Sequence, residues 1–146
     1  WWYGAVGNDQ IHAPWLDESF AKYSEVLYYE RYAPHLTDWW WEQSVYKWNP
    51  NGPLDSTIYD YPDTATYVHM VYGQGARFMA DLRALMGDEA FFSFIQAYYQ
   101  DNRHNHLVTK SDFFTSVRDH TDADLSPLLT RYFSNPPPEL LAPSNP

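Results

Sequence analysis

The chain has 146 residues, which is the length of a single domain or of one part of a larger domain. Its formal net charge of −10 at pH 7, with no run of basic residues, argues against nucleic acid and anionic membranes as partners, because both require clustered Lys and Arg. The absence of cysteine excludes disulfides, thiolate zinc sites and cysteine nucleophiles. No apolar stretch has membrane-spanning length, and no signal-peptide pattern is present.

The N-terminal residues 1–13 are predicted to form a loop, because glycines and an Asn-Asp pair interrupt them. A helix is predicted over residues 16–32. Pro14 suits its first turn, and the acidic pair Asp17-Glu18 suits the positive end of its dipole. The helix is expected to end before the next proline.

This first helix is predicted to have two different faces. One face carries an apolar stripe with a 4-3-4 spacing, formed by Leu16, Phe20, Tyr23 and Leu27. The opposite face carries Glu18, Lys22, Glu25 and Tyr29. Taken alone, Glu18 and Lys22 are best explained as a helix-stabilising i,i+4 pair in solvent. If Glu18 has a chemical role, that face looks into a site instead.

Two further helices are predicted over residues 37–48 and 64–86, with an irregular loop over residues 54–62 between them. The first carries Trp39-Trp40-Trp41, and three adjacent side chains cannot all face one side of a helix. At least one tryptophan is therefore expected to lie against another surface or to line a pocket. A core or domain contact is the simpler explanation, and an aromatic platform for substrate or sugar is the alternative.

The helix over residues 64–86 is bounded by two punctuating residues, Asp63 as its N-cap and Gly87 at its C′ position. It contains Gly73 and Gly75, each of which costs about 1 kcal/mol relative to Ala in a helix. Glycines inside a helix indicate the close approach of another backbone. The neighbouring Tyr72, taken alone, is best explained as a core tyrosine.

Three more helices are predicted over residues 88–101, 109–119 and 124–133, so the fold class is mainly α, with about five to six helices. The loop between the first two holds His104 and His106, which have a spacing that can bind metal. Without a nearby carboxylate, a surface loop is the simpler explanation. Residues 135–146 contain five prolines and are predicted to be a tail, which puts the domain boundary at residue 134.

Three segments together resemble the gluzincin zinc aminopeptidases, the family of membrane alanyl aminopeptidase and leukotriene A4 hydrolase. Trp15-Leu16-Asp17-Glu18 is similar to the family's W-L-N-E segment, and Tyr72-Gly73-Gln74-Gly75-Ala76 is similar to its Y-x-K-G-A segment, with Gln74 in place of Lys. The opening Trp1-Trp2-Tyr3-Gly4 resembles the residues that follow the family's H-E-x-x-H-Q. With that missing Gln restored, eighteen residues separate Glu18 from the second His, which is the family's spacing.

The resemblance implies the helical subdomain of a thermolysin-like catalytic domain, with a zinc ion held by two His and one Glu and an open position for water. Glu18 would be the carboxylate ligand, and Tyr72 would be the hydroxyl that steadies the reaction intermediate. Glu25 would orient a metal ligand without binding the metal itself, or would be a surface carboxylate. Asp17 would form local hydrogen bonds. The substrate class implied is peptides, cut at their N-terminal residues.

The sequence contains no H-E-x-x-H and no amine-binding G-A-M-E-N segment, so neither His ligand nor the general base is present. We therefore expect a C-terminal part of the catalytic domain that is inactive and binds no catalytic zinc by itself. Its missing N-terminal lobe would be its partner, and exposed aromatic surface would favour self-association. The resemblance weakly favours an extracytoplasmic or membrane-associated parent protein.

Three alternatives remain open at this stage. The chain could come from a gluzincin relative that has lost its catalytic motif and serves as a binding or scaffold module. It could be an unrelated aromatic-rich helical module that binds sugars or peptides through Trp39-Trp40-Trp41, in which case Glu18 and Tyr72 should lie far apart. It could also belong to a zinc endopeptidase of the same clan, since only the missing amine-binding segment separates the two activities.

Overall fold

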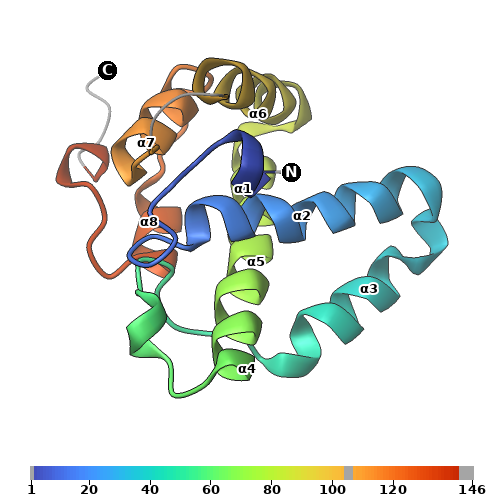
Figure 1. Ribbon diagram of the computed structural model, residues 1–146. Coiled ribbons are helices and arrows are strands. Elements are labelled where there is room, and N and C mark those ends of the chain that lie inside the picture. The colour runs from blue at the N-terminus through green and yellow to red at the C-terminus, as the bar shows by residue number, and fades with distance from the viewer. Residues whose placement is uncertain (1, 104–106, 142–146) are drawn as a thin grey trace.

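The computed structural model describes residues 2–103 and 107–141, and these fold into helices joined by short loops (Figure 1). The α-helices are α1 (Trp2–Ala5), α2 (Trp15–Tyr32), α3 (Thr37–Ser44), α4 (Thr64–Tyr67), α5 (Gly73–Met86), α6 (Asp88–Asn102), α7 (Lys110–Arg118) and α8 (Ser126–Tyr132). Short 3-10 turns are η1 (Pro34–Leu36), η2 (Tyr46–Trp48), η3 (Ile58–Asp60) and η5 (Pro138–Leu140), and η4 (Val68–Tyr72) is a π-helical turn. Extended pairing within the described ranges is limited to one isolated parallel bridge between Asn8 and Val108. The predicted mainly α class is confirmed.

Aromatic side chains fill the core between the helices. Trp15, at the start of α2, is buried and contacts three phenylalanine rings edge-on at centroid distances of 5.0–5.9 Å, those of Phe78, Phe113 and Phe133. Phe20 lies five residues later and stacks on Tyr98 of α6 at 5.1 Å. Each buried aromatic side chain removes a large apolar area from water, so α2 is fixed against α5, α6 and α7 along one face.

Helices α2 and α5 cross near the centre of the molecule (Figure 1). They cross at Gly75, where a Cβ atom would lie 2.4 Å from Ser19 Oγ and 2.8 Å from Ser19 Cα. The second of these atoms belongs to the backbone, which cannot move aside without separating the helices. The predicted close approach at Gly75 is therefore confirmed, and it fixes where α2 and α5 touch.

A methyl group at this crossing should destabilise the chain. We expect Gly75→Ala to lower the free energy of unfolding by about 1–3 kcal/mol, the usual cost of overpacking a well-packed contact. Urea unfolding followed by far-UV circular dichroism measures this. Gly4→Ala is the matched control, because a Cβ at Gly4 meets nothing within 4 Å. Equal stability of the two variants would mean that the crossing is looser than described.

The predicted helix limits hold for most of the chain. Predicted residues 16–32 correspond to α2 and residues 88–101 to α6, each within one residue at either end. Asp63 accepts a hydrogen bond from the backbone N–H of Thr66, as an N-cap does. Thr109 and Asp112 form a reciprocal capping box at α7.

Three predicted elements need correction. Residues 1–13 are not all loop, because Trp2–Ala5 form the short helix α1. The helix predicted over residues 37–48 is interrupted at Val45, which lies outside helical geometry at φ −129° and is buried. The helix predicted over residues 64–86 contains the π-helical turn η4, which separates α4 from α5.

The three adjacent tryptophans face different surroundings, as the helical geometry requires. Trp40 is 2% exposed and donates from its indole nitrogen to Glu25, whereas Trp39 is 54% exposed. Trp41 is partly buried and stacks on Tyr46 at 5.6 Å. Among residues 2–103 and 107–141, no helix has the length and apolarity needed to cross a membrane.

Candidate active site

Glu18 and Tyr72, the two residues singled out from the sequence, lie in contact. Glu18 is in the first turn of α2, and Tyr72 is the last residue of η4, immediately before α5. The hydroxyl of Tyr72 donates a hydrogen bond to Glu18 Oε1. The crossing of α2 and α5 at Ser19 and Gly75, each one to three residues away in sequence, holds these side chains together. This contact contradicts the alternative of an unrelated aromatic-rich helical module, which predicted that Glu18 and Tyr72 lie far apart.

The pKa values of this pair are set mainly by burial. Burial raises the pKa of Glu18, and the hydrogen bond from Tyr72 acts in the opposite direction. Burial and the neighbouring Glu18 carboxylate raise the pKa of Tyr72 far above its ordinary value of 10.0. The phenol therefore keeps its proton at neutral pH and is available as a hydrogen-bond donor.

Tyr67 is a further residue of the site that the sequence did not reveal. Its ring meets that of Tyr72 edge-on at 6.2 Å, and its phenol interacts with the Glu18 carboxylate. Burial, followed by the negative charges of Glu18 and Asp17, raises the pKa of Tyr67 to about 12. Tyr67 and Tyr72 are five residues apart, a spacing that a π-helical turn brings to one side and an α-helix does not. Only a prediction of this π-helical turn from the sequence could have placed Tyr67 beside Tyr72.

Asp17 forms local hydrogen bonds, as expected. It is 3% exposed, and its carboxylate accepts from the Asn8 side-chain amide at 3.4 Å and from the Gln10 amide at 2.8 Å. Burial raises the pKa of Asp17, and the two amide donors only partly offset that effect. Its role here is to tie the loop before α2 to the first turn that carries Glu18.

Glu25, the other carboxylate considered for the site, lies two turns after Glu18 and points at different partners. It accepts from the indole nitrogen of Trp40 at 3.0 Å and forms an ion pair with Lys22 at 2.9 Å. Nearly half of its side chain is exposed. These contacts account for Glu25 as a link between α2 and α3.

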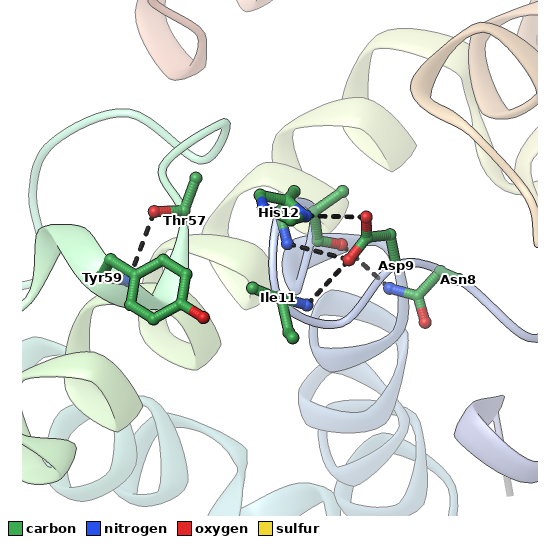
Figure 2. Close-up of polar contacts among 7 residues, drawn as sticks. Asn8, Asp9, Ile11, His12, Thr57 and Tyr59 are labelled. Carbon is green, nitrogen blue, oxygen red and sulfur yellow. Dashed lines mark hydrogen bonds and ion pairs between the residues drawn. The ribbon is translucent and has the colours of Figure 1, made fainter.

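Two cavities open beside Glu18. One, of about 560 Å³, lies between the loop before α2 and the segment before α4, and its walls include Gln10, Ile11, Ile58, Tyr61 and Tyr67. The backbone N–H of Ile58 donates to the carbonyl of Ile11 at 3.0 Å and joins these walls. Figure 2 shows the two loops facing each other there, with the Asp9 carboxylate accepting from the backbone N–H groups of Ile11 and His12.

The second cavity, of about 550 Å³, is mainly apolar and lies between α1, α2 and α6. Its walls include Trp2, Asp17, Glu18, Ala21, Ile95 and Tyr99. Trp2 is held in place by its stacking on Phe20 at 4.3 Å and by a hydrogen bond from its indole nitrogen to Ser24 Oγ. This hollow gives α2 an apolar surface next to Glu18.

Of the residues that the structure describes, Glu18 fits one ligand of a zinc site. Glu18 offers a carboxylate in a partly buried position with a phenol beside it, which suits a metal ligand. Within residues 2–103 and 107–141, no three His, Cys, Asp or Glu side chains gather closely enough to hold a metal ion. His104 and His106 lie outside the described residues.

Comparison with known proteins places these features in a family. The sequence profile of the peptidase family M1 domain matches residues 1–132. Aminopeptidase N of Lactococcus lactis subsp. lactis is 26% identical over 140 residues, and aminopeptidase N of Streptomyces lividans is 28% identical over 139 residues. These matches cover 84% and 85% of this chain but only 16% of each relative.

The fold is similar to that of two solved structures. One is a variant of an M1 zinc metallopeptidase from Deinococcus radiodurans bound to a Tyr-Ser-Ala substrate, with a TM-score of 0.61 and 27% identity. The other is a variant of a two-domain M1 zinc metallopeptidase bound to L-arginine, with a TM-score of 0.61 and 26% identity. Each covers 91% of this chain, and the chain covers 30% of each.

Proposed function

Since the chain belongs to peptidase family M1, we propose that it is the helical part of a zinc aminopeptidase catalytic domain, in which Glu18 binds the zinc ion and Tyr72 binds the oxyanion of the reaction. The observation that carries this proposal is the hydrogen bond between Tyr72 and Glu18. These two residues belong to separate helices and lie 54 positions apart in the chain. Family membership supports the reaction class, and the contact supports the two residue roles.

In this proposal each residue has a distinct chemical task. Bound zinc supplies an activated water and polarises the peptide carbonyl. The Tyr72 phenol, whose raised pKa keeps it protonated, donates a hydrogen bond to the oxygen on which negative charge develops. A cation beside Glu18 would favour its ionised form and oppose the effect of burial.

We further propose that residues 1–134 pack against a lobe of the longer protein that supplies the two His ligands, the general base and the amine-binding residues. The apolar cavity between α1, α2 and α6 supports this, because its walls of Trp2, Ala21 and Ile95 lie beside Glu18 and would be covered by such a lobe. Residues 135–146 would be a tail outside that contact. The isolated chain would then associate with itself through the uncovered surface.

The proposal separates the activity of this chain from that of the longer protein. We expect the longer protein to release N-terminal residues from aminoacyl substrates in a zinc-dependent reaction, and the purified 146-residue chain to show neither hydrolysis nor stoichiometric zinc. Aminoacyl-coumarin hydrolysis and metal analysis of both proteins measure this. Acetylated peptides serve as the control substrate, because an aminopeptidase rejects a blocked amine. Zinc-dependent hydrolysis by the short chain, lost in Glu18→Ala, would contradict it.

A further inference from the structure

A third cavity adjoins the ring of Tyr72 and has a different chemical character. It has a volume of about 270 Å³. Its walls include Lys22, Gln43, Ser44, Trp48, His69 and Tyr72. Tyr72 lines this cavity, whereas Glu18 and Tyr67 line the 560 Å³ cavity described above. The two cavities therefore share no lining residue, and among the described residues that line the smaller one there is no Asp or Glu, although the Glu25 carboxylate is bonded to its Lys22.

Lys22 brings a positive charge to this cavity, and its position is fixed. Its ammonium group donates to both oxygens of Glu25, at 2.9 and 3.2 Å, and lies 5.0 Å from the centre of the Trp40 ring. Glu25 is itself held by the indole nitrogen of Trp40. An ammonium group has three N–H donors, so one remains for a ligand after both bonds to Glu25 are made. Only 18% of the Lys22 side chain is exposed, which limits screening by water.

His69 and two uncharged polar groups complete the lining. The imidazole ring of His69 stacks on the Trp48 ring at 3.8 Å with an interplanar angle of 10°, which holds the ring plane. His69 belongs to η4, three residues before Tyr72. The hydroxyl of Ser44 and the amide of Gln43, from the end of α3, are further donors. One ammonium, one imidazole and two neutral donors around a small space suit a carboxylate group.

We propose that this cavity binds a carboxylate of the peptide substrate next to the bond that is cut, with Lys22 as the main determinant. This inference rests on the proposed function for two statements: that the ligand is a peptide, and that Tyr72 lies beside the bond that is cut. The carboxylate has two possible sources: the acidic side chain of the residue after the bond, or the terminal carboxylate of a dipeptide. Both present the same group beside Tyr72.

Binding can be measured on the 146-residue chain without any catalytic activity. N-acetylglycine is the anionic probe, and N-acetylglycine amide is its neutral counterpart. We expect the anion alone to shift the NMR signals of the His69 imidazole and the Trp48 indole. Lys22→Met should weaken this binding about tenfold, which is the usual effect of losing a charged hydrogen-bond donor. Lys22→Arg should largely retain it.

Lys47→Met is the matched control for charge. Lys47 also lies beside Trp48, with its ammonium group 5.0 Å from the ring centre, but it is not part of the cavity wall. We expect its replacement to leave binding of N-acetylglycine unchanged. Equal shifts with the anion and the amide, or equal weakening in Lys22→Met and Lys47→Met, would overturn the proposal. Thermal melting of each variant is measured to check that the variant is folded.

Kinetics of the longer protein then identify the source of the carboxylate. Leu-Asp amide and Leu-Asn amide differ only in the second side chain, and Leu-Ala and Leu-Ala amide differ only in the terminal carboxylate. The pair whose kcat/KM ratio falls about tenfold in Lys22→Met contains the group that binds. If both ratios stay unchanged while Leu-Ala amide is still hydrolysed, the carboxylate site is wrong and the aminopeptidase assignment stands. If no substrate is hydrolysed by the unaltered protein, the proposed function fails, and the binding measurement still decides the cavity.

Discussion

Replacing Tyr72 by phenylalanine in the longer protein is expected to lower kcat by about 10²–10³-fold, because a single oxyanion donor typically contributes about 2.7–4 kcal/mol to transition-state stabilisation. Only the hydroxyl is removed, and the ring stays in its place against Tyr67. KM and the zinc content should therefore change little. Steady-state kinetics on an aminoacyl substrate, together with metal analysis, measure all three quantities.

Tyr98→Phe is the control for the removal of a buried phenolic hydroxyl. Tyr98 is fully buried in α6 among Phe20, Phe94 and Phe113, and it lines neither of the two cavities beside Glu18. Its kcat should stay close to that of the unaltered protein. A loss in Tyr72→Phe that appears in KM or in zinc content rather than in kcat would contradict the oxyanion role.

Replacing Glu18 by glutamine in the longer protein is expected to abolish both zinc retention and peptidase activity. A neutral amide is a much weaker metal ligand than a carboxylate, and Glu18 is the carboxylate of the proposed three-ligand set. Removing a residue that only hydrogen-bonds a metal ligand lowers metal affinity by about 10–100-fold. The loss of zinc affinity in Glu18→Gln should be larger than this. Metal analysis after dialysis and the zinc concentration needed for half-maximal activity measure this.

Glu25→Gln gives the same chemical change two turns away on the same helix. Glu25 is bound to Lys22 and Trp40, so its replacement should leave zinc retention nearly unchanged. If both variants lost zinc equally, Glu25 would be a part of the metal site. If neither lost zinc, Glu18 would not be a ligand.

Much of the fold follows from local sequence signals because those signals act over a few residues. Asp63 and Thr109 cap helices through hydrogen bonds to backbone groups three residues away, and Gly87 ends α5 with φ +81°. The apolar stripe of α2 predicted its buried face, since Leu16, Phe20 and Tyr23 are all buried. Each of these features is decided by the residue and its near neighbours.

What the sequence did not reveal depends on contacts between distant segments. Val45 interrupts the predicted helix because burying its side chain in the core takes precedence over continuing the helix. Trp2 belongs to a helix that the neighbouring glycines and polar residues do not suggest, and it is held by Phe20 and Ser24. The sequence did not point to Tyr67, because helical periodicity assumes 3.6 residues per turn throughout. With that assumption, residues five apart do not fall on the same side of a helix as Tyr72.

In the site itself, the resemblance to a family predicted which two residues matter, and the crossing at Gly75 explains how they meet. Neither Glu18 nor Tyr72 is distinguishable by composition or spacing alone from a surface glutamate or a core tyrosine. Their contact depends on two helices that pack at one point, 54 positions apart in the chain. Such a contact is a tertiary property.

The π-helical turn Val68–Tyr72 makes the positions of Tyr67 and His69 relative to Tyr72 depend on chain length as well as on residue type. Deleting one residue, such as Met70, would let this turn relax into ordinary α-helix. Every side chain before it would then rotate by about 100° relative to those after it. Tyr72 would keep its position before α5 and its hydrogen bond to Glu18, but Tyr67 and His69 would rotate away from Tyr72. A single-codon deletion could thus separate the two phenols without replacing either one, a change that no comparison of residue identities at the site would register.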